Sequence, residues 1–480
     1  MNVKTIFKQF LTVGIGTILT MVISVITTPI ITRLVTPEEY GRFSLFIMYG
    51  NIALSVFCLG LDQALVRYYY EENSIGYRNA LLYKCVRIPL IIILACFMAF
   101  LALNNCSVLR TEEHIPLFIS ILFFVYTLIL VIQRYSSLTV RLERRVKLYS
   151  FLGILIKTLF VVLAIIFLKV LNAYPSELLM VAITVSTGIA MLLGIIAQAN
   201  IWKFEKEIKK RCVVPTKELI RYAYPYVFAL GISSFFQGID KMSLNYYSTY
   251  AEVGVYSSAM SIVNIFSILQ TTFNSLYSPM ALEHYAKDKQ DTSFYEIANR
   301  IITVLMFFFG LTLILFKDIF VLLLGEKYRE AACILPFLIF HPIMYTISET
   351  TVCGLVFMKK SKMQVVIAAI SCLANLLGNA ILVPIYGGRG AAFSTGVSYI
   401  IFFTLRTLIS NRYFKLNISF NKFYAVTIIT GVYAIYNTVG ENCIVSVLGY
   451  IICVTVLLVM YKDTVFQLIQ YGKQILSRGK

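Results

Sequence analysis

The sequence predicts an all-helical integral membrane protein, and three observations support this: an apolar composition, little charge and many long apolar runs. Hydrophobic residues make up 59% of the 480 residues and charged residues 14%. A soluble chain carries roughly a quarter charged residues, because charge covers its surface. The composition therefore excludes the soluble, disordered, collagen-like and disulfide-scaffold classes. Seven of the ten cysteines fall in apolar runs, where a thiol acts as a small hydrophobe.

Fourteen runs are long enough to cross a bilayer, whose apolar layer takes about 20 helical residues. In chain order they are 11–32, 43–66, 86–103, 115–133, 148–168, 177–200, 222–240, 255–280, 301–324, 331–357, 363–384, 390–409, 423–439 and 443–461. Three of the runs are the weakest: the seventh carries Pro225, Gly231 and Gly238, the tenth carries His341, Pro342 and Glu349, and the thirteenth is short. The first is too long for a cleavable signal peptide and lacks a small-residue cleavage site. Gly387, Gly388 and Gly390 form a turn between the eleventh and twelfth runs.

Basic residues set the predicted orientation. With the N-terminus inside, inner segments hold 32 Lys and Arg and outer loops hold 9, and Lys157 lies within a span. This asymmetry places both termini in the cytoplasm. The densest basic cluster, 203–221, is interpreted as an anchor against anionic lipid, with a partner site as the alternative. The net charge of +18 therefore does not predict a nucleic-acid partner.

Short loops limit the chemistry. The longest segments outside the predicted spans are about twenty residues, such as 201–221, which leaves no room for a soluble catalytic domain. No phosphate-binding GxxxxGK[ST] pattern, HExxH pattern or CxxC pair occurs. We therefore expect that the protein is not an enzyme and holds no metal or organic cofactor.

An internal repeat relates residues 36–52 to residues 249–265. The identical pairs are Thr36/Thr249, Glu39/Glu252, Gly41/Gly254, Ser44/Ser257, Asn51/Asn264 and Ile52/Ile265. The offset equals six spans, so the two halves have the same orientation, as in transporters built from parallel repeats. We predict an N-lobe at 1–200, a basic cytoplasmic linker at 201–221, a C-lobe at 222–410, and a helical hairpin with a cytoplasmic tail at 411–480. The alternative is a common helix-start pattern that recurs by chance.

Several motifs carry a family resemblance. Residues 29–44 read PIITRLVTPEEYGRFS and residues 59–70 read LGLDQALVRYYY; GIDK at 238–241, VGVYSSA at 253–259, Asn375 and PIYGGRGAA at 384–392 follow. Together they resemble the polysaccharide transporters of the multidrug/oligosaccharidyl-lipid/polysaccharide (MOP) exporter superfamily, the Wzx-like O-antigen flippases. The resemblance implies a two-lobed fold like that of MATE transporters and a cationic central cavity. It also implies transfer of an undecaprenyl-pyrophosphate-linked oligosaccharide to the outer leaflet of the bacterial cytoplasmic membrane, for O-antigen, capsule or exopolysaccharide synthesis. The polymerase and glycosyltransferases of such a pathway are candidate partners, besides membrane lipids.

An anionic cargo head needs cations, and ionisable groups within a membrane are costly, so we take them as functional candidates. The substrate-binding candidates are Arg33, Arg67, Lys157, Lys241, Asn51 and Asn264. Arg33 matches an arginine that closes the first span in related lipid II flippases. The alternatives are a snorkelling Lys157, interfacial anchoring by Arg33 and Arg67, and helix–helix hydrogen bonds by the asparagines.

Three carboxylates are candidates for coupling transport to a proton or sodium gradient: Asp62, Asp240 and Glu349. Alternatively, Asp62 neutralises Arg67, Asp240 forms an outer-surface pair with Lys241, and Glu349, without a basic neighbour within one helical turn, packs in a bent helix. The membrane potential is the third source of energy.

Three rival functions remain. A multidrug/cation antiporter has the same architecture but an acidic cavity, and a lipid II-type flippase is closer. A membrane-embedded glycan polymerase would need a larger outer loop; Glu112, Glu113 and His114 are interpreted as a solvated loop.

Overall fold

The computed structural model describes residues 19–20, 22–105, 117–171, 174–203, 214–440, 442–466 and 470. These residues form helices and connecting turns, with no strand among them, as predicted. Eight of the described helices are long and apolar enough to cross a membrane, or up to ten if each bent pair is one span. The predicted number of fourteen spans stays a prediction. The described chain divides into two compact units after Gly238.

The first unit is built mainly from α2 (Pro37–Phe57), α3 (Leu61–Tyr68), α4 (Ile75–Asn105), α5 (Leu117–Leu142), α6 (Val146–Leu171), α7 (Pro175–Ile196) and most of α8 (Thr216–Tyr247). A shorter apolar helix covers Val22–Thr32. Residues 11–18 and 21 of the predicted first span, 11–32, lie outside the described residues, as does the loop at 112–114.

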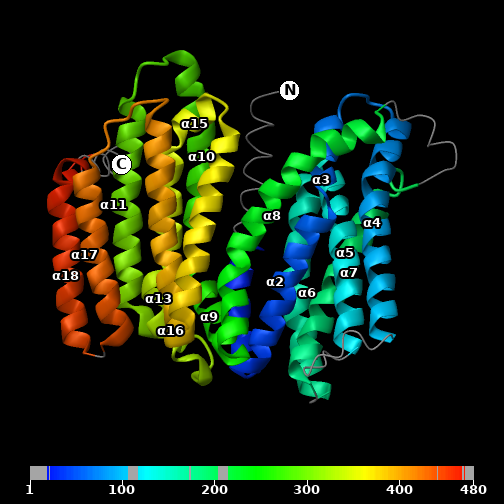
Figure 1. Ribbon diagram of the computed structural model, residues 1–480, viewed down its shortest axis with the longest axis horizontal. Coiled ribbons are helices and arrows are strands. Elements are labelled where there is room, and N and C mark those ends of the chain that lie inside the picture. Colours follow the sequence, from blue (N-terminus) through cyan, green and yellow to red (C-terminus); the bar gives the residue numbers. More distant parts are fainter. Residues whose placement is uncertain are drawn as a thin grey trace, which may run out of the picture. The chain divides into compact units, whose positions relative to one another are not determined.

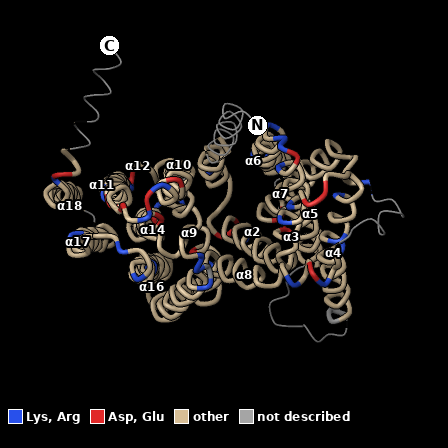
Figure 2. Tube along the Cα trace, turned by 90° about the horizontal axis from the view of Figure 1, so that it is seen from above, with Lys and Arg blue, Asp and Glu red and all other residues tan. Residues whose placement is uncertain are grey.

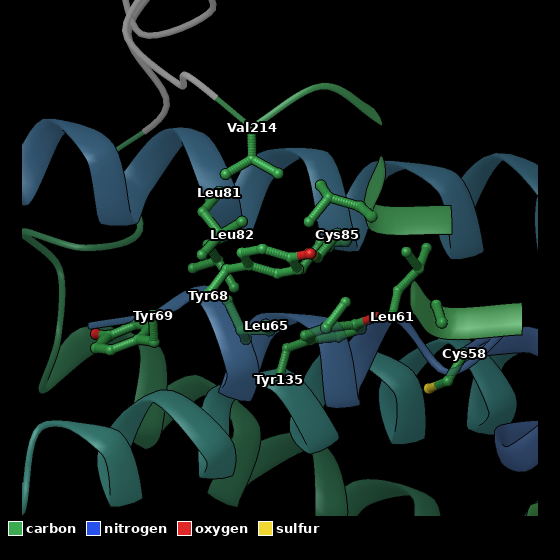
Figure 3. Packing of buried hydrophobic residues seen from close by; sticks show 14 of the residues in the cluster. Cys58, Leu61, Leu65, Tyr68, Tyr69, Leu81, Leu82, Cys85, Tyr135 and Val214 are labelled. Atoms are coloured by element: carbon green, nitrogen blue, oxygen red, sulfur yellow. The ribbon is translucent and has the colours of Figure 1, made fainter. Parts of the chain in front are cut away.

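A sharp bend of 56° separates α2 from α3. Gly60 begins the second segment with a φ of 69°, a conformation that glycine adopts without strain. A Cβ at Gly60 would lie 2.4 Å from the carbonyl oxygen of Ala223 in α8. The backbones of α3 and α8 therefore approach closely at this bend. The apolar residues of α3, such as Leu61 and Leu65, then pack into the apolar core shown in Figure 3.

The second unit contains the C-terminal end of α8 and the helices that follow it (Figure 1). They are α9 (Tyr250–Val263), α10 (Ile265–Lys287), α11 (Ser293–Leu315), α12 (Lys317–Leu322), α13 (Ala331–Leu338), α14 (Phe340–Thr351), α15 (Cys353–Phe357), α16 (Ser361–Asn411), α17 (Phe420–Val439) and α18 (Cys443–Met460), with a 3-10 turn at Glu326–Tyr328. The predicted span 331–357 is broken into α13, α14 and α15. Pro336 and Pro342 lie in this stretch, and proline removes a helical hydrogen bond.

The long helix α16 reverses direction at Gly387, whose φ of 54° and ψ of −132° are not helical. A Cβ at Gly378 would lie 2.8 Å from Ser394 Oγ. In a straight helix these two residues would be about 24 Å apart. The segment is thus a hairpin of two limbs, and the predicted turn at 387–390 is confirmed. Glu252 of α9 accepts a 2.8 Å hydrogen bond from the Gly388 N–H at this turn.

The two repeat segments begin α2 and α9 at equivalent residues, because Thr36 precedes Pro37 and Thr249 precedes Tyr250. Thr249 caps its helix by accepting a hydrogen bond from the Glu252 N–H. The two compact units divide inside α8. The predicted limits of the lobes, with a linker at 201–221, stay a prediction.

Candidate functional site

Charged residues are sparse in both units, so the few that lie inside the helix bundles stand out (Figure 2). Each unit holds a carboxylate that is almost completely buried, Asp62 in the first and Asp240 in the second. The second unit also holds the pair formed by Glu349 and Arg406.

Asp62 lies on the first turn of α3 and pairs with Arg134 of α5. Asp62 Oδ2 accepts hydrogen bonds from Arg134 Nη2 at 2.8 Å and from Arg134 Nε at 3.1 Å. The Gln63 side chain donates to the same oxygen at 2.9 Å. The predicted pair of Asp62 with Arg67 is wrong: Arg67 is exposed and pairs with Glu71 at 3.1 Å. Five residues turn a helix by about 500°, so the side chains of Asp62 and Arg67 point in different directions.

The ends of α3 and α5 are tied together just beyond this pair. The Tyr70 hydroxyl donates to the carbonyl oxygen of Leu142, and the Tyr69 hydroxyl donates to Glu143 at 2.7 Å. Arg78 adds an ion pair with Glu143 at 2.9 Å. Burial and the bond to Glu143 raise the pKa of the Tyr69 phenol, so it remains a hydrogen-bond donor. These contacts fix how far α3 can slide along α5, and so they keep Asp62 beside Arg134.

Asp240 lies near the C-terminal end of α8 and is enclosed by neutral donors. Its Oδ1 accepts hydrogen bonds from the amides of Asn375, at 3.0 Å, and Asn379, at 2.8 Å. Its Oδ2 accepts from the hydroxyls of Tyr256 and Thr395, both at 2.7 Å. The Asp240 carboxylate is buried among side chains of α9 and both limbs of α16, so the alternative of an outer-surface position is wrong, although its charge interacts with that of Lys241.

Glu349 of α14 has a basic partner from another helix. Arg406, on the second limb of α16, donates from Nη1 to Glu349 at 2.7 Å and to Ser348 Oγ at 2.6 Å. The guanidinium also lies over the rings of Tyr345 and Phe402. No basic residue stands within one turn of Glu349 along its own helix, as the sequence indicates, but the packing of α16 supplies one. Glu349 is therefore an ion-paired carboxylate rather than an isolated one.

The six predicted substrate-binding residues are spread over both units. Arg33, Arg67, Asn51 and Asn264 have exposed side chains, and those of Lys157 and Lys241 are half-buried. Lys157 lies near the middle of α6, as expected. Asn51 is inside α2, whereas Asn264 is at the junction of α9 and α10. Their role in binding stays a prediction.

The sequence alone does not single out Arg134 and Arg406, which follow or end predicted spans and belong to the basic residues of the predicted inner segments. The signal that singles them out is a partner acid on a helix far away in the sequence. Tyr256, Asn375 and Thr395 lie in or beside the quoted motifs, which was a usable signal. The residues that the structure describes contain no group of three or more His, Cys, Asp or Glu arranged to hold a metal ion.

The chain resembles known proteins along most of its length. A family described as "Polysaccharide biosynthesis protein" matches residues 6–284. An uncharacterized membrane protein of Methanocaldococcus jannaschii is 24% identical over 428 residues, covering 83% of this chain and 82% of that protein. A probable low-salt glycan biosynthesis flippase of Haloferax volcanii is 24% identical over 204 residues, 42% of this chain and 43% of that protein.

Solved structures show the same fold. The inward closed conformation of the lipid II flippase MurJ superposes with a TM-score of 0.70 at 16% identity, covering 94% of this chain and 99% of that chain. An inward-facing MATE multidrug transporter of the MOP superfamily gives a TM-score of 0.60 at 14% identity, covering 82% of this chain and 94% of that chain. The proteins with a named activity in this set are flippases and transporters, which agrees with the expectation of a non-enzyme. The chain is a multi-pass membrane protein with the MOP fold, and it belongs to the polysaccharide biosynthesis protein family.

Proposed function

We propose that this protein is a flippase that moves a polyprenyl-pyrophosphate-linked oligosaccharide from the inner to the outer leaflet of the cytoplasmic membrane by alternating access. One observation carries the proposal: a chain of a polysaccharide biosynthesis family has, over 94% of its length, the fold of a lipid II flippase. A hydrophilic sugar chain does not cross an apolar layer about 30 Å thick unaided, because its polar groups would lose their hydrogen bonds. Glycosyltransferases and a polymerase would act before and after this step.

The test uses purified protein in liposomes that contain a fluorescent lipid-linked oligosaccharide in both leaflets. A lectin added outside binds only the outward-facing sugar. We expect the protein to make the inner pool accessible within minutes, whereas protein-free liposomes stay half-labelled. No gain in accessibility would reject the proposal. Efflux of a lipophilic cation drug in the same liposomes, without oligosaccharide transfer, would favour the multidrug/cation antiporter.

The membrane potential supplies the driving force in this proposal. A charge that crosses the membrane is worth about 2.3 kcal/mol per 100 mV, so two negative charges leaving a negative interior gain roughly 5 kcal/mol. We expect the transfer rate to fall when a potassium ionophore collapses the potential alone. Transfer that ignores the potential and follows a pH or sodium gradient would reject electrical driving.

Of the three coupling candidates, Asp240 suits an exchangeable proton or sodium ion best. Its four hydrogen-bond donors are all neutral and its charged neighbour is Lys241, whereas Asp62 and Glu349 are each bonded directly to an arginine. Carboxylate, amide and hydroxyl oxygens are the ligands that hard cations prefer. Replacement of Asp240 by asparagine should remove any dependence of transfer on the pH or sodium gradient, while dependence on the potential remains.

A further inference from the structure

Arg134 presents an unused edge of its guanidinium beside its bond to Asp62. A guanidinium has five N–H donors, and Asp62 takes one from Nε and one from Nη2. The two donors of Nη1 and the second donor of Nη2 remain, and no acceptor among the described residues takes them. The Arg134 side chain is 40% exposed, whereas that of Asp62 is 4% exposed. The pair thus has a buried acidic side and an open basic side.

The depth of the pair restricts what the open side can face. Arg134 lies eight residues before Leu142, the end of α5, which places it about 12 Å inside that end. The bond from Tyr70 to Leu142 brings the end of α3 to the same level. A guanidinium that faces lipid is costly, so we expect the open edge of Arg134 to face water or a polar ligand.

The packing around Tyr135 fixes this orientation. Tyr135 follows Arg134 in the chain and is fully buried in the apolar cluster with Leu61 and Leu65 (Figure 3). Neighbouring residues on a helix point about 100° apart. The anchoring of Tyr135 in the core therefore turns Arg134 out of it, and Asp62 holds the guanidinium in place from one side.

We infer that Arg134 binds a phosphate group of the lipid-linked cargo through its Nη1/Nη2 edge, and that Asp62 is the residue that positions it. This inference rests on the proposed flippase function. Two N–H donors of that edge match two phosphate oxygens in a forked arrangement, which lysine cannot reproduce. Because Asp62 neutralises the arginine between transport cycles, the site holds no unpaired buried charge when it is empty.

The experiment compares Arg134→Lys, Arg134→Gln and Asp62→Asn with Arg141→Lys, a matched control on the same helix. Inorganic pyrophosphate is the probe: thermal stabilisation of the purified protein gives its apparent affinity, and the liposome assay gives the KM for the cargo. We expect Arg134→Lys to weaken both about 10-fold, the loss of one charge-assisted hydrogen bond. Arg134→Gln should weaken them more, and Arg141→Lys should leave both unchanged.

Asp62→Asn should weaken pyrophosphate binding about 3-fold in the presence of Arg134. It should have no further effect in the Arg134→Lys background, because a positioning residue acts only through the group that it positions. Additive effects of the two substitutions would reject the positioning role of Asp62. A general loss of stability would not produce this dependence on the background.

The outcomes separate the inference from the function on which it rests. Arg134→Lys is expected to fold, since it keeps a cation beside Asp62, and gel filtration checks this. Wild-type KM and pyrophosphate affinity in a folded Arg134→Lys protein would overturn the inference and leave the flippase function intact. Wild-type protein that binds pyrophosphate in an Arg134-dependent way but transfers no oligosaccharide would instead reject the flippase function.

Discussion

Replacement of Asp240 by alanine tests the hydrogen-bond network of the second unit most directly. The substitution removes the acceptor of four buried donors, the side chains of Asn375, Asn379, Tyr256 and Thr395. At about 0.6 kcal/mol for each hydrogen bond between helices in a membrane, the loss is about 2 kcal/mol. Donors left without an acceptor raise the cost toward about 4 kcal/mol. We therefore expect Asp240→Ala to destabilise the protein by about 2 to 4 kcal/mol.

Replacement by asparagine is the informative comparison, because it keeps the shape of the side chain. Its oxygen can accept from the two amides, and its NH₂ group can donate to the hydroxyls of Tyr256 and Thr395, which rotate to accept. All four partners thus keep a hydrogen bond, and we expect Asp240→Asn to cost about 1 kcal/mol or less. The carboxylate charge is lost all the same.

Stability is measured by unfolding in mixed micelles, with Asp318→Ala as the control at an exposed aspartate of the same unit. The control should lie within about 1 kcal/mol of the wild type. Asp240→Ala as stable as the control would refute the hydrogen-bond argument. Equal destabilisation by alanine and asparagine would mean that the negative charge, rather than the number of acceptors, holds the network together.

Other substitutions probe the bend, the second ion pair and the lysine within α6. Gly60→Ala should destabilise the first unit by at least about 2 kcal/mol, because its φ is positive and the new Cβ would meet the Ala223 carbonyl at 2.4 Å; wild-type stability would contradict the close approach of α3 and α8. Glu349→Ala should cost about 3 to 5 kcal/mol, because Arg406 is left buried and unpaired. The double variant Glu349→Ala, Arg406→Met should recover much of that stability, and a double variant as unstable as the single one would argue against an ion pair. Lys157→Ala should reduce glycan export in cells at normal protein abundance, and unchanged export would remove Lys157 from the binding site.

The helices could be predicted from the sequence because a helix that crosses lipid must be apolar along its own length. The turn at Gly387 was predicted for a similar reason, since three glycines within four residues interrupt a long apolar run. The points at which a helix is interrupted are harder to predict. The helices α13, α14 and α15 form one apolar run with two prolines, and the neighbouring sequence does not determine whether a proline bends the helix or ends it.

The partners of the buried acids were not predictable in the same way. Asp62 and Arg134 are 72 residues apart in the sequence, and Glu349 and Arg406 are 57 apart. Sequence spacing within one helical turn indicates only partners on the same helix. For Asp62 that spacing points to Arg67, whereas the actual partner is Arg134. Pairing between helices depends on how the helices are rotated about their axes. That rotation is set by the burial of neighbouring apolar residues such as Tyr135, which periodicity alone does not fix.

The two arginines that pair with acids on other helices show why a pair of opposite charges does not by itself indicate a binding site. The Arg406 side chain is 8% exposed, with two oxygen acceptors at Nη1 and two aromatic rings against its guanidinium. An anion could reach it only if α14 and α16 moved apart, so its role is to hold those helices together. Arg134 has the opposite arrangement, because its acid is the buried partner and its own edge is open. The geometry therefore indicates that Arg406 stabilises the packing of helices and that Arg134 recognises a ligand. In the sequence, both are simply basic residues near the end of an apolar run.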